Sequence, residues 1–203
     1  MSKKSKILFV GNNYTFYNQM PQGAFAETAR AAGYEVEVTE ITHGGYRLCQ
    51  FADAADEEGK RLREVTDGVR YDCAVLQEQS LNPIRNQEEF LVGVRDVMAS
   101  IRAERFVLFA TWGRNDGSIA LRELGLTREE MTEKLSIAYN KAGKAYGARV
   151  AEVGKAFLAY AAENDKDALY DADKSHPSAL GSELAAKVIC ERVFGDHAQN
   201  FDE

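Results

Sequence analysis

The stretch Ile7-Leu8-Phe9-Val10-Gly11-Asn12-Asn13 joins four apolar residues to a glycine and two amides. A short apolar run is typical of a buried strand, and a glycine followed by polar residues indicates a turn into a helix. In an α/β fold, residues that directly follow a strand lie at the edge of the sheet where ligands bind. The stretch therefore predicts a first strand that delivers Asn12, Asn13 and Tyr14 to a site.

Short apolar runs alternate with longer segments of helical spacing along the rest of the chain. The longest helical segment opens with Thr127 and Glu130, the pattern of a capping box, and stops at Gly147. Such alternation predicts a parallel sheet with helices on both faces, in a single domain over residues 1–203 whose acidic tail, 195–203, frays. The expected strands are 7–10, 34–41, 72–76, 106–110 and 148–153, and the expected helices are 21–32, 51–66, 88–101, 127–146, 155–162 and 177–194.

Composition narrows the classes of protein to consider. A chain of 203 residues fits one domain, and a net charge of -7 without any Lys/Arg cluster argues against a nucleic-acid partner. No run approaches the roughly 20 apolar residues of a membrane span, and ILFV after MSKKSK is too short for a signal peptide. Three cysteines without metal-site spacing favour a reducing cytoplasm, and we expect no metal or other cofactor. The oligomeric state stays open.

Polar residues and glycines also follow the second, third and fourth expected strands. Gly45 could offer a backbone N–H to an oxyanion or simply form a turn, and neighbouring His43 could line the same cleft or have no role. Gln77 and Gln79 could each donate a side-chain N–H to the same oxyanion. Alternatively, one of them could simply form hydrogen bonds with backbone groups of the loop. Trp112 could form a wall of the pocket or belong to the core.

Asp173 and His176 are the strongest local pair in the sequence. An aspartate three residues before a histidine can hold one ring nitrogen and leave the other free to act as a base. Taken alone, the pair is better explained by an aspartate that caps a turn and a histidine at the surface.

These blocks, in this order, resemble the SGNH (GDSL-type) hydrolase family over nearly the whole chain. Gly11-Asn12-Asn13 falls on the nucleophile block, Gly45 on the oxyanion glycine, and Asp173-Lys174-Ser175-His176 on the D-x-x-H block; HPSALGSELAAKVI resembles the family's last helix. The resemblance implies a flavodoxin-like three-layer α/β/α sandwich, hydrolysis of an acyl or acetyl ester without a cofactor, and an Asp173–His176 pair that serves a nucleophile.

The chain departs from the family at two blocks. The third block usually reads G-x-N-D, whereas this chain has LQEQS, so that Gln79 falls on the asparagine and Gln77 lies close by. The serine position holds Asn13, whose amide nitrogen a histidine cannot activate usefully. The resemblance thus implies an ester hydrolase domain that is inactive or impaired, with a small acyl or acetylated molecule as its partner.

Other interpretations of Asn13 stay open. The domain could bind an acyl or carbohydrate ligand without turnover, or Asp173 and His176 could activate a water for slow one-step hydrolysis. Asn13 could also be an engineered replacement of a serine. A scaffold that keeps the blocks for folding alone is disfavoured, because nothing in the fold requires an Asp/His pair there. The substrate cannot be predicted from the sequence.

Overall fold

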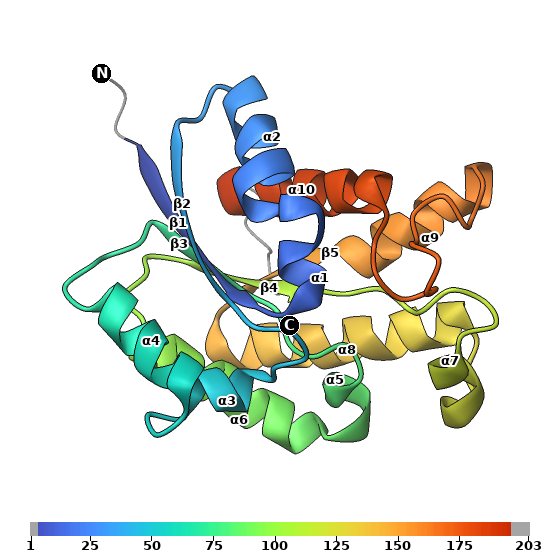
Figure 1. Cartoon of the computed structure of the whole chain (residues 1–203), viewed down its shortest axis with the longest axis horizontal. Coiled ribbons are helices and arrows are strands. Elements are labelled where there is room, and N and C mark those ends of the chain that lie inside the picture. The colour runs from blue at the N-terminus through green and yellow to red at the C-terminus, as the bar shows by residue number, and fades with distance from the viewer. Residues whose placement is uncertain (1–3, 196–203) are drawn as a thin grey trace.

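The computed structural model describes residues 4–195 and has a five-stranded sheet at its centre (Figure 1). The strands are β1 (Ser5–Gly11), β2 (Val36–Thr42), β3 (Cys73–Leu76), β4 (Phe106–Ala110) and β5 (Arg149–Glu152). All neighbouring strands pair in parallel, in the order β2-β1-β3-β4-β5. This is the flavodoxin-like strand order, with helices on both faces of the sheet. The α/β fold expected from the sequence is therefore confirmed, and all five expected strands are present.

Alternate residues of the strands supply two separate hydrophobic cores, one on each face of the sheet. In β1, Leu8 and Val10 belong to one core, Ile7 and Phe9 belong to the other, and all four are fully buried. Because side chains of a strand alternate between its two faces, a fully apolar run implies a strand covered on both sides. This explains why β1 could be predicted from its composition alone.

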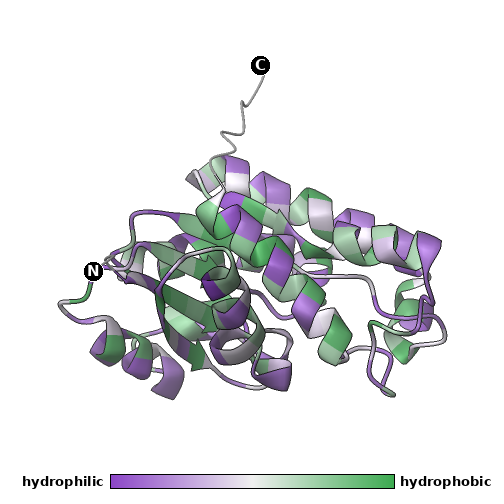
Figure 2. Cartoon of the chain, turned by 90° about the horizontal axis from the view of Figure 1, so that it is seen from above, coloured by the Kyte–Doolittle hydropathy of each residue, from purple (hydrophilic) through white to green (hydrophobic). Residues whose placement is uncertain are grey.

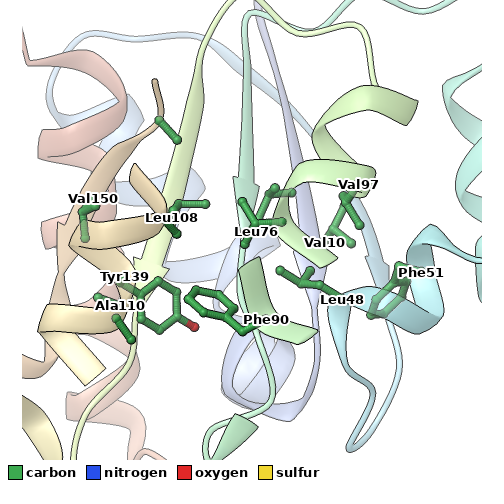
Figure 3. Packing of buried hydrophobic residues seen from close by; sticks show 14 of the residues in the cluster. Val10, Leu48, Phe51, Leu76, Phe90, Val97, Leu108, Ala110, Tyr139 and Val150 are labelled. Atoms are coloured by element: carbon green, nitrogen blue, oxygen red, sulfur yellow. The ribbon is translucent and has the colours of Figure 1, made fainter. Parts of the chain in front are cut away.

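The first core lies between the sheet and the helices drawn below it in Figure 1. Figure 3 shows this core from close by: Val10, Leu76 and Leu108 of three adjacent strands face Phe90 and Tyr139 of the covering helices. The elements on this face are α3 (Leu48–Ala52), α4 (Glu57–Thr66), α5 (Asn82–Arg85), α6 (Gln87–Ser100), α7 (Ile119–Leu124) and α8 (Arg128–Tyr146).

The second core lies on the opposite face, under elements from both ends of the chain. The N-terminal elements there are α1 (Asn13–Phe16), the 3-10 turn η1 (Tyr17–Gln19), the π-helical turn η2 (Pro21–Phe25) and α2 (Ala26–Ala31), and the C-terminal ones are α9 (Val153–Glu163) and α10 (Ala179–Phe194). Figure 2 shows hydrophilic and hydrophobic residues in alternating bands along the outer helices, as expected of helices with one face on a core. Helix α10 packs against η2, which joins the two ends of the chain.

Several expected helices differ in detail from the observed ones. The expected helix 51–66 is wrong as a single helix: α3 ends at Ala52, and α4 restarts after Asp56, whose side chain accepts the N–H of Glu58. The break is packed tightly, because a Cβ on Gly59 would lie 1.8 Å from the carbonyl oxygen of Asp53. The segment 21–32 begins with a π-helical turn, which the sequence pattern does not distinguish from an α-helix.

The ends of two long helices show which local signals were reliable. Helix α8 starts with the expected capping box between Thr127 and Glu130 and stops at Gly147, whose φ is 69°. The last helix starts two residues later than expected, because Ser178 is its N-cap and Pro177 instead pairs with Tyr170 in an isolated bridge. The expected fraying of the tail 195–203 falls almost wholly outside the described residues.

The carboxyl ends of four strands meet at one edge of the sheet. Gly11 is in register with Thr42, Val10 with Leu76, and Leu76 with Leu108. The loops that leave these strands therefore start side by side, at the crevice where the chain order of the strands reverses. Within residues 4–195, no helix is long and apolar enough to cross a membrane.

Candidate functional site

The turn after β1 holds Asn13 in a fixed position as the first residue of α1. The Asn12 side chain caps this helix by accepting the N–H of Tyr14 at 3.3 Å, and the backbone N–H of Asn12 donates to Gln77 Oε1 at 2.9 Å. The hydroxyl of Thr15 donates to the same Gln77 oxygen at 2.9 Å. Gly11 leaves room for this arrangement, because a Cβ there would lie 2.4 Å from Thr15 Oγ1. The buried side chain of Gln77 thus stabilises the turn through these two hydrogen bonds.

The side chain of Asn13 bridges two groups that a hydrolase would use separately. Gly45 N–H donates to Asn13 Oδ1 at 2.6 Å, and Asn13 Nδ2 lies 2.9 Å from His176 Nε2. A backbone N–H can only donate, so the atom that faces Gly45 must be the amide oxygen. The amide nitrogen therefore faces His176 and donates to Nε2. This assigns the remaining imidazole proton to Nδ1.

Asp173 accepts that Nδ1 proton and holds the imidazole in place. Asp173 Oδ2 is hydrogen-bonded to His176 Nδ1, and Oδ1 accepts the backbone N–H groups of Ser175 and His176 at 2.9 Å each. Burial acts to raise the pKa of Asp173, but the hydrogen bonds from His176 and from the two N–H groups outweigh it and keep this pKa below its ordinary value. Asp173 is thus an ionised carboxylate that orients a neutral histidine.

Aromatic rings surround the imidazole of His176. Tyr17 stacks on it with ring centres 4.5 Å apart, and Tyr14 meets it edge-on at 5.6 Å. Trp112 lies behind Tyr14, stacked at 4.7 Å, and is itself stacked on Phe157 at 4.3 Å. Trp112 is fully buried. Of the two roles considered for Trp112, the structure places it in the core behind the pocket wall, and it identifies Tyr17 as a neighbour of the base that the sequence did not single out.

A cavity of about 270 Å³ opens over this arrangement. Besides Trp112, two expected residues do not line it: the buried Gln77 follows β3 and directs its side chain to the turn after β1, and His43 Nδ1 lies 3.3 Å from Glu58 Oε1. A larger hollow of about 610 Å³ lies against η2 and α10 and contains no histidine. The 270 Å³ cavity is lined by the expected Asn12, Asn13, Tyr14, Gly45, Gln79, Asp173 and His176, and by Ser80, Arg114 and Ser175, which were not among the expected site residues.

Gln79 is the glutamine that reaches the cavity. Its Oε1 accepts the N–H groups of Leu81 and Asn82, at 2.9 and 3.1 Å, and so caps the start of α5. Its Nε2 makes no hydrogen bond within the described part of the chain. The neighbouring Glu78 is fully buried and accepts the N–H groups of Gln79 and Leu48; burial raises its pKa to about 7.

The arrangement has a base, a group that orients the base, and donors for an oxyanion, but no attacking oxygen beside the base. The Ser175 hydroxyl is hydrogen-bonded to Tyr14 Oη at 2.7 Å, and the Thr15 hydroxyl donates to Gln77. Asn13 Oδ1 occupies the place where Gly45 N–H would meet a developing oxyanion. The site can therefore polarise a carbonyl only after the Asn13 side chain has moved away.

The known structures that this chain resembles include proteins described as SGNH or GDSL-like hydrolases. It matches "a putative SGNH hydrolase from Slackia heliotrinireducens" with a TM-score of 0.79 and 29% identity, over 94% of this chain and 99% of that one. A DUF4886 family protein from Bacteroides uniformis matches with a TM-score of 0.79 and 16% identity, over 95% and 83% of the two chains. An acetylxylan esterase from Geobacillus stearothermophilus matches at 0.69 and 12%, over 96% and 97%.

The last two likenesses show the fold alone, because fewer than a quarter of the residues are identical. No protein-family model and no curated protein matches the sequence.

Proposed function

We propose that this chain is an SGNH-type domain for ester hydrolysis in which Asn13 blocks acyl transfer. The observation that carries the proposal is the double hydrogen bond of the Asn13 amide, to Gly45 N–H and to His176 Nε2. A serine at residue 13 would leave Gly45 N–H free for an oxyanion and offer a hydroxyl to the histidine. Asp173, His176 and Gln79 support the proposal, because they line the same cavity as Asn13.

The same hydrogen bonds weigh against slow hydrolysis by an activated water. Such a water would have to approach His176 Nε2, which already accepts a hydrogen bond from Asn13. It would also need Gly45 N–H to polarise the substrate, and that donor is engaged by the Asn13 oxygen. Water activation would therefore have to break two hydrogen bonds before it began.

Binding of an acyl or carbohydrate ligand without turnover is the second candidate function. The cavity of about 270 Å³ favours it, because Gln79 and Arg114 keep unused donors in its lining. Small-ligand sites are concave and have a few polar groups that fix the orientation of the ligand. This function and a blocked hydrolase differ in what happens once a nucleophile is supplied.

The test is to supply that nucleophile and measure hydrolysis of 4-nitrophenyl acetate. Asn13→Ser should raise turnover above the unchanged protein by at least about 100-fold, because loss of the serine from a comparable triad costs about 10⁶ in turnover. Asn13→Ala should give no gain, since it removes the block without adding an attacking oxygen. His176→Ala in the Asn13→Ser background should abolish the gain, whereas His43→Ala should not, because His43 lies outside the cavity.

Two results would contradict the proposal. If Asn13→Ser folds normally and still gains nothing, more than the nucleophile is missing and the binding function is preferred. If the unchanged protein already turns over the ester, and His176→Ala but not His43→Ala removes this activity, a water mechanism operates and Asn13 is not a block.

A further inference from the structure

Arg114 carries the feature of the cavity that ester hydrolysis does not explain. It lies in the loop after β4, where its backbone N–H points at Met131 Sδ at 3.5 Å and its Nη2 donates to Ser80 Oγ at 3.2 Å. Its Nε is buried and has no hydrogen-bond partner, and the residue makes no ion pair within the part of the chain that the structure describes. The guanidinium thus lines the cavity with a single hydrogen bond in the described structure and with a buried Nε that has no partner.

The absence of an ion pair at Arg114 does not reflect a shortage of carboxylates in the chain. The sequence has 32 Asp and Glu residues against 25 Lys and Arg residues, so carboxylates are plentiful. Some arginines pair with a carboxylate, as Arg47 does with Glu89 at 2.8 Å, and others, such as Arg63 and Arg149, donate to backbone carbonyl oxygens. Leaving a partly buried guanidinium without an anion costs free energy, which a bound anion would recover.

The carboxylate that shares the cavity with Arg114 does not neutralise it. Asp173 is held by the His176 ring and by two backbone N–H groups, and these contacts use both of its oxygens. Arg114 instead lies near the hydroxyl of Tyr14. Burial raises the pKa of this hydroxyl above its ordinary value, and the guanidinium offsets part of the rise. The cation therefore faces a wall of hydroxyl groups, from Tyr14, Ser80 and Ser175, that cannot carry a compensating charge at neutral pH.

We propose that Arg114 binds a carboxylate on the ligand, so that the molecule recognised is a short acyl ester or amide with an acid group at its other end. This rests on the proposed function, which places the acyl carbonyl near Gly45 and Gln79. A guanidinium presents a planar fork of donors that matches the two oxygens of a carboxylate. The cavity of about 270 Å³ limits the ligand to a few carbons between the two groups.

A phosphate suits this cavity less well than a carboxylate. Arg114 is the one arginine or lysine in the lining, and the carboxylate of Asp173 lies in the same small space. Arg114 can balance the single charge of a monoanion, whereas a dianion would keep one unbalanced negative charge near the carboxylate of Asp173. Inorganic phosphate is therefore a probe that should bind more weakly than a monocarboxylate.

The first test is binding to the protein as it is, with ligands matched in shape. Monomethyl succinate and dimethyl succinate share one skeleton and differ in charge, and ligand-observed NMR titration measures both even at weak affinity. The monoester should bind at least about 10-fold more tightly than the diester. Arg114→Gln should lower its affinity about 10- to 100-fold, the range for hydrogen bonds to charged groups, and Arg114→Lys should recover part of the loss. Arg95→Gln is the matched control, because Arg95 is an exposed residue of α6 paired with Asp96.

The second test uses turnover in the Asn13→Ser background. There, Arg114→Gln should lower kcat/KM for 4-nitrophenyl hydrogen succinate about 10- to 100-fold, with less than about a 3-fold change for 4-nitrophenyl butyrate, which lacks the acid. If Asn13→Ser hydrolyses neither ester but the binding test succeeds, the proposed function fails and the carboxylate site stands. If both esters are hydrolysed with no effect of Arg114, the carboxylate site fails and the proposed function stands.

Two outcomes would overturn the inference directly. In one, dimethyl succinate binds as well as the monoester and Arg114→Gln changes neither affinity. In the other, inorganic phosphate binds more tightly than monomethyl succinate in an Arg114-dependent way, which would replace the carboxylate with a phosphate group. A folded Arg114→Gln variant is expected, because the side chain makes a single hydrogen bond in the described structure.

Discussion

Glu78 should make the stability of this protein fall as the pH rises. Its carboxyl group is fully buried beneath the loop after β3 and accepts two backbone N–H groups, those of Leu48 and Gln79. Burial raises its pKa to about 7, and the two hydrogen bonds offset only part of that rise. The group is a neutral acid in the folded protein over a range of pH in which it is a free carboxylate in the unfolded chain.

The size and sign of the effect follow from the two pKa values. An unfolded glutamate has its pKa near 4.5 and the folded group near 7, so below about pH 4 the group is protonated in both states and costs nothing. As the pH rises from the unfolded pKa to the folded pKa, the folded protein keeps a proton on Glu78 that the unfolded chain releases. Folding therefore becomes less favourable. Glu78 therefore lowers the free energy of unfolding by less than about 1 kcal/mol at pH 5 and by about 3 kcal/mol at pH 8.

Glu78→Gln removes the titrating group but keeps an oxygen that can accept the same N–H groups. Urea denaturation should show the variant within about 1 kcal/mol of the parent at pH 5 and more stable by about 2 to 3 kcal/mol at pH 8. Glu133→Gln is the control, because Glu133 is an exposed residue of α8 with no hydrogen bond or ion pair in the described structure. If Glu78→Gln shifts the free energy of unfolding equally at both pH values, the carboxyl is ionised in the folded protein and the argument is wrong.

Two further changes test the packing and the helix ends by urea denaturation. Gly113→Ala should cost at least about 2 kcal/mol, because its Cβ would lie 2.1 Å from the Arg128 carbonyl oxygen; Gly23→Ala, where nothing lies within 4 Å, should be neutral or slightly stabilising, and equal costs would refute the clash. Thr127→Ala should cost about 1 kcal/mol by removing the cap of α8, whereas Thr127→Ser should cost little; a loss shared by both variants would mean that the methyl group, not the hydroxyl, matters.

The sheet could be predicted from the sequence because its signals are local. Three of the five strands, β1, β3 and β4, are built on short apolar runs, and the alternation with helical segments leaves few arrangements open. The break between α3 and α4 could not be predicted in the same way. It depends on the close approach of Gly59 to Asp53, a contact made by folding and not by propensity.

Some site residues could be predicted because they follow strands, whereas others could be identified only from contacts in the folded structure. Asn13, Gly45 and His176 were chosen because each follows a strand or belongs to a recognisable block, and the structure brings all three together. Arg114 also follows a strand, but a charged residue in a loop is no signal until its missing partner is seen. Tyr17 reaches His176 through a turn in which Asn18 has a φ of 54°, a conformation that no pattern indicated.

The hydrogen bond between Asn13 and His176 joins residues that are 163 positions apart. During translation, residue 13 leaves the ribosome early, and all five strands have been synthesised by Glu152, more than twenty residues before the imidazole. A nascent chain, or a product of premature termination, that ends between Glu163 and His176 therefore has every strand of the sheet but lacks this imidazole. The contact between Asn13 and His176 can form only once the chain has been synthesised beyond His176.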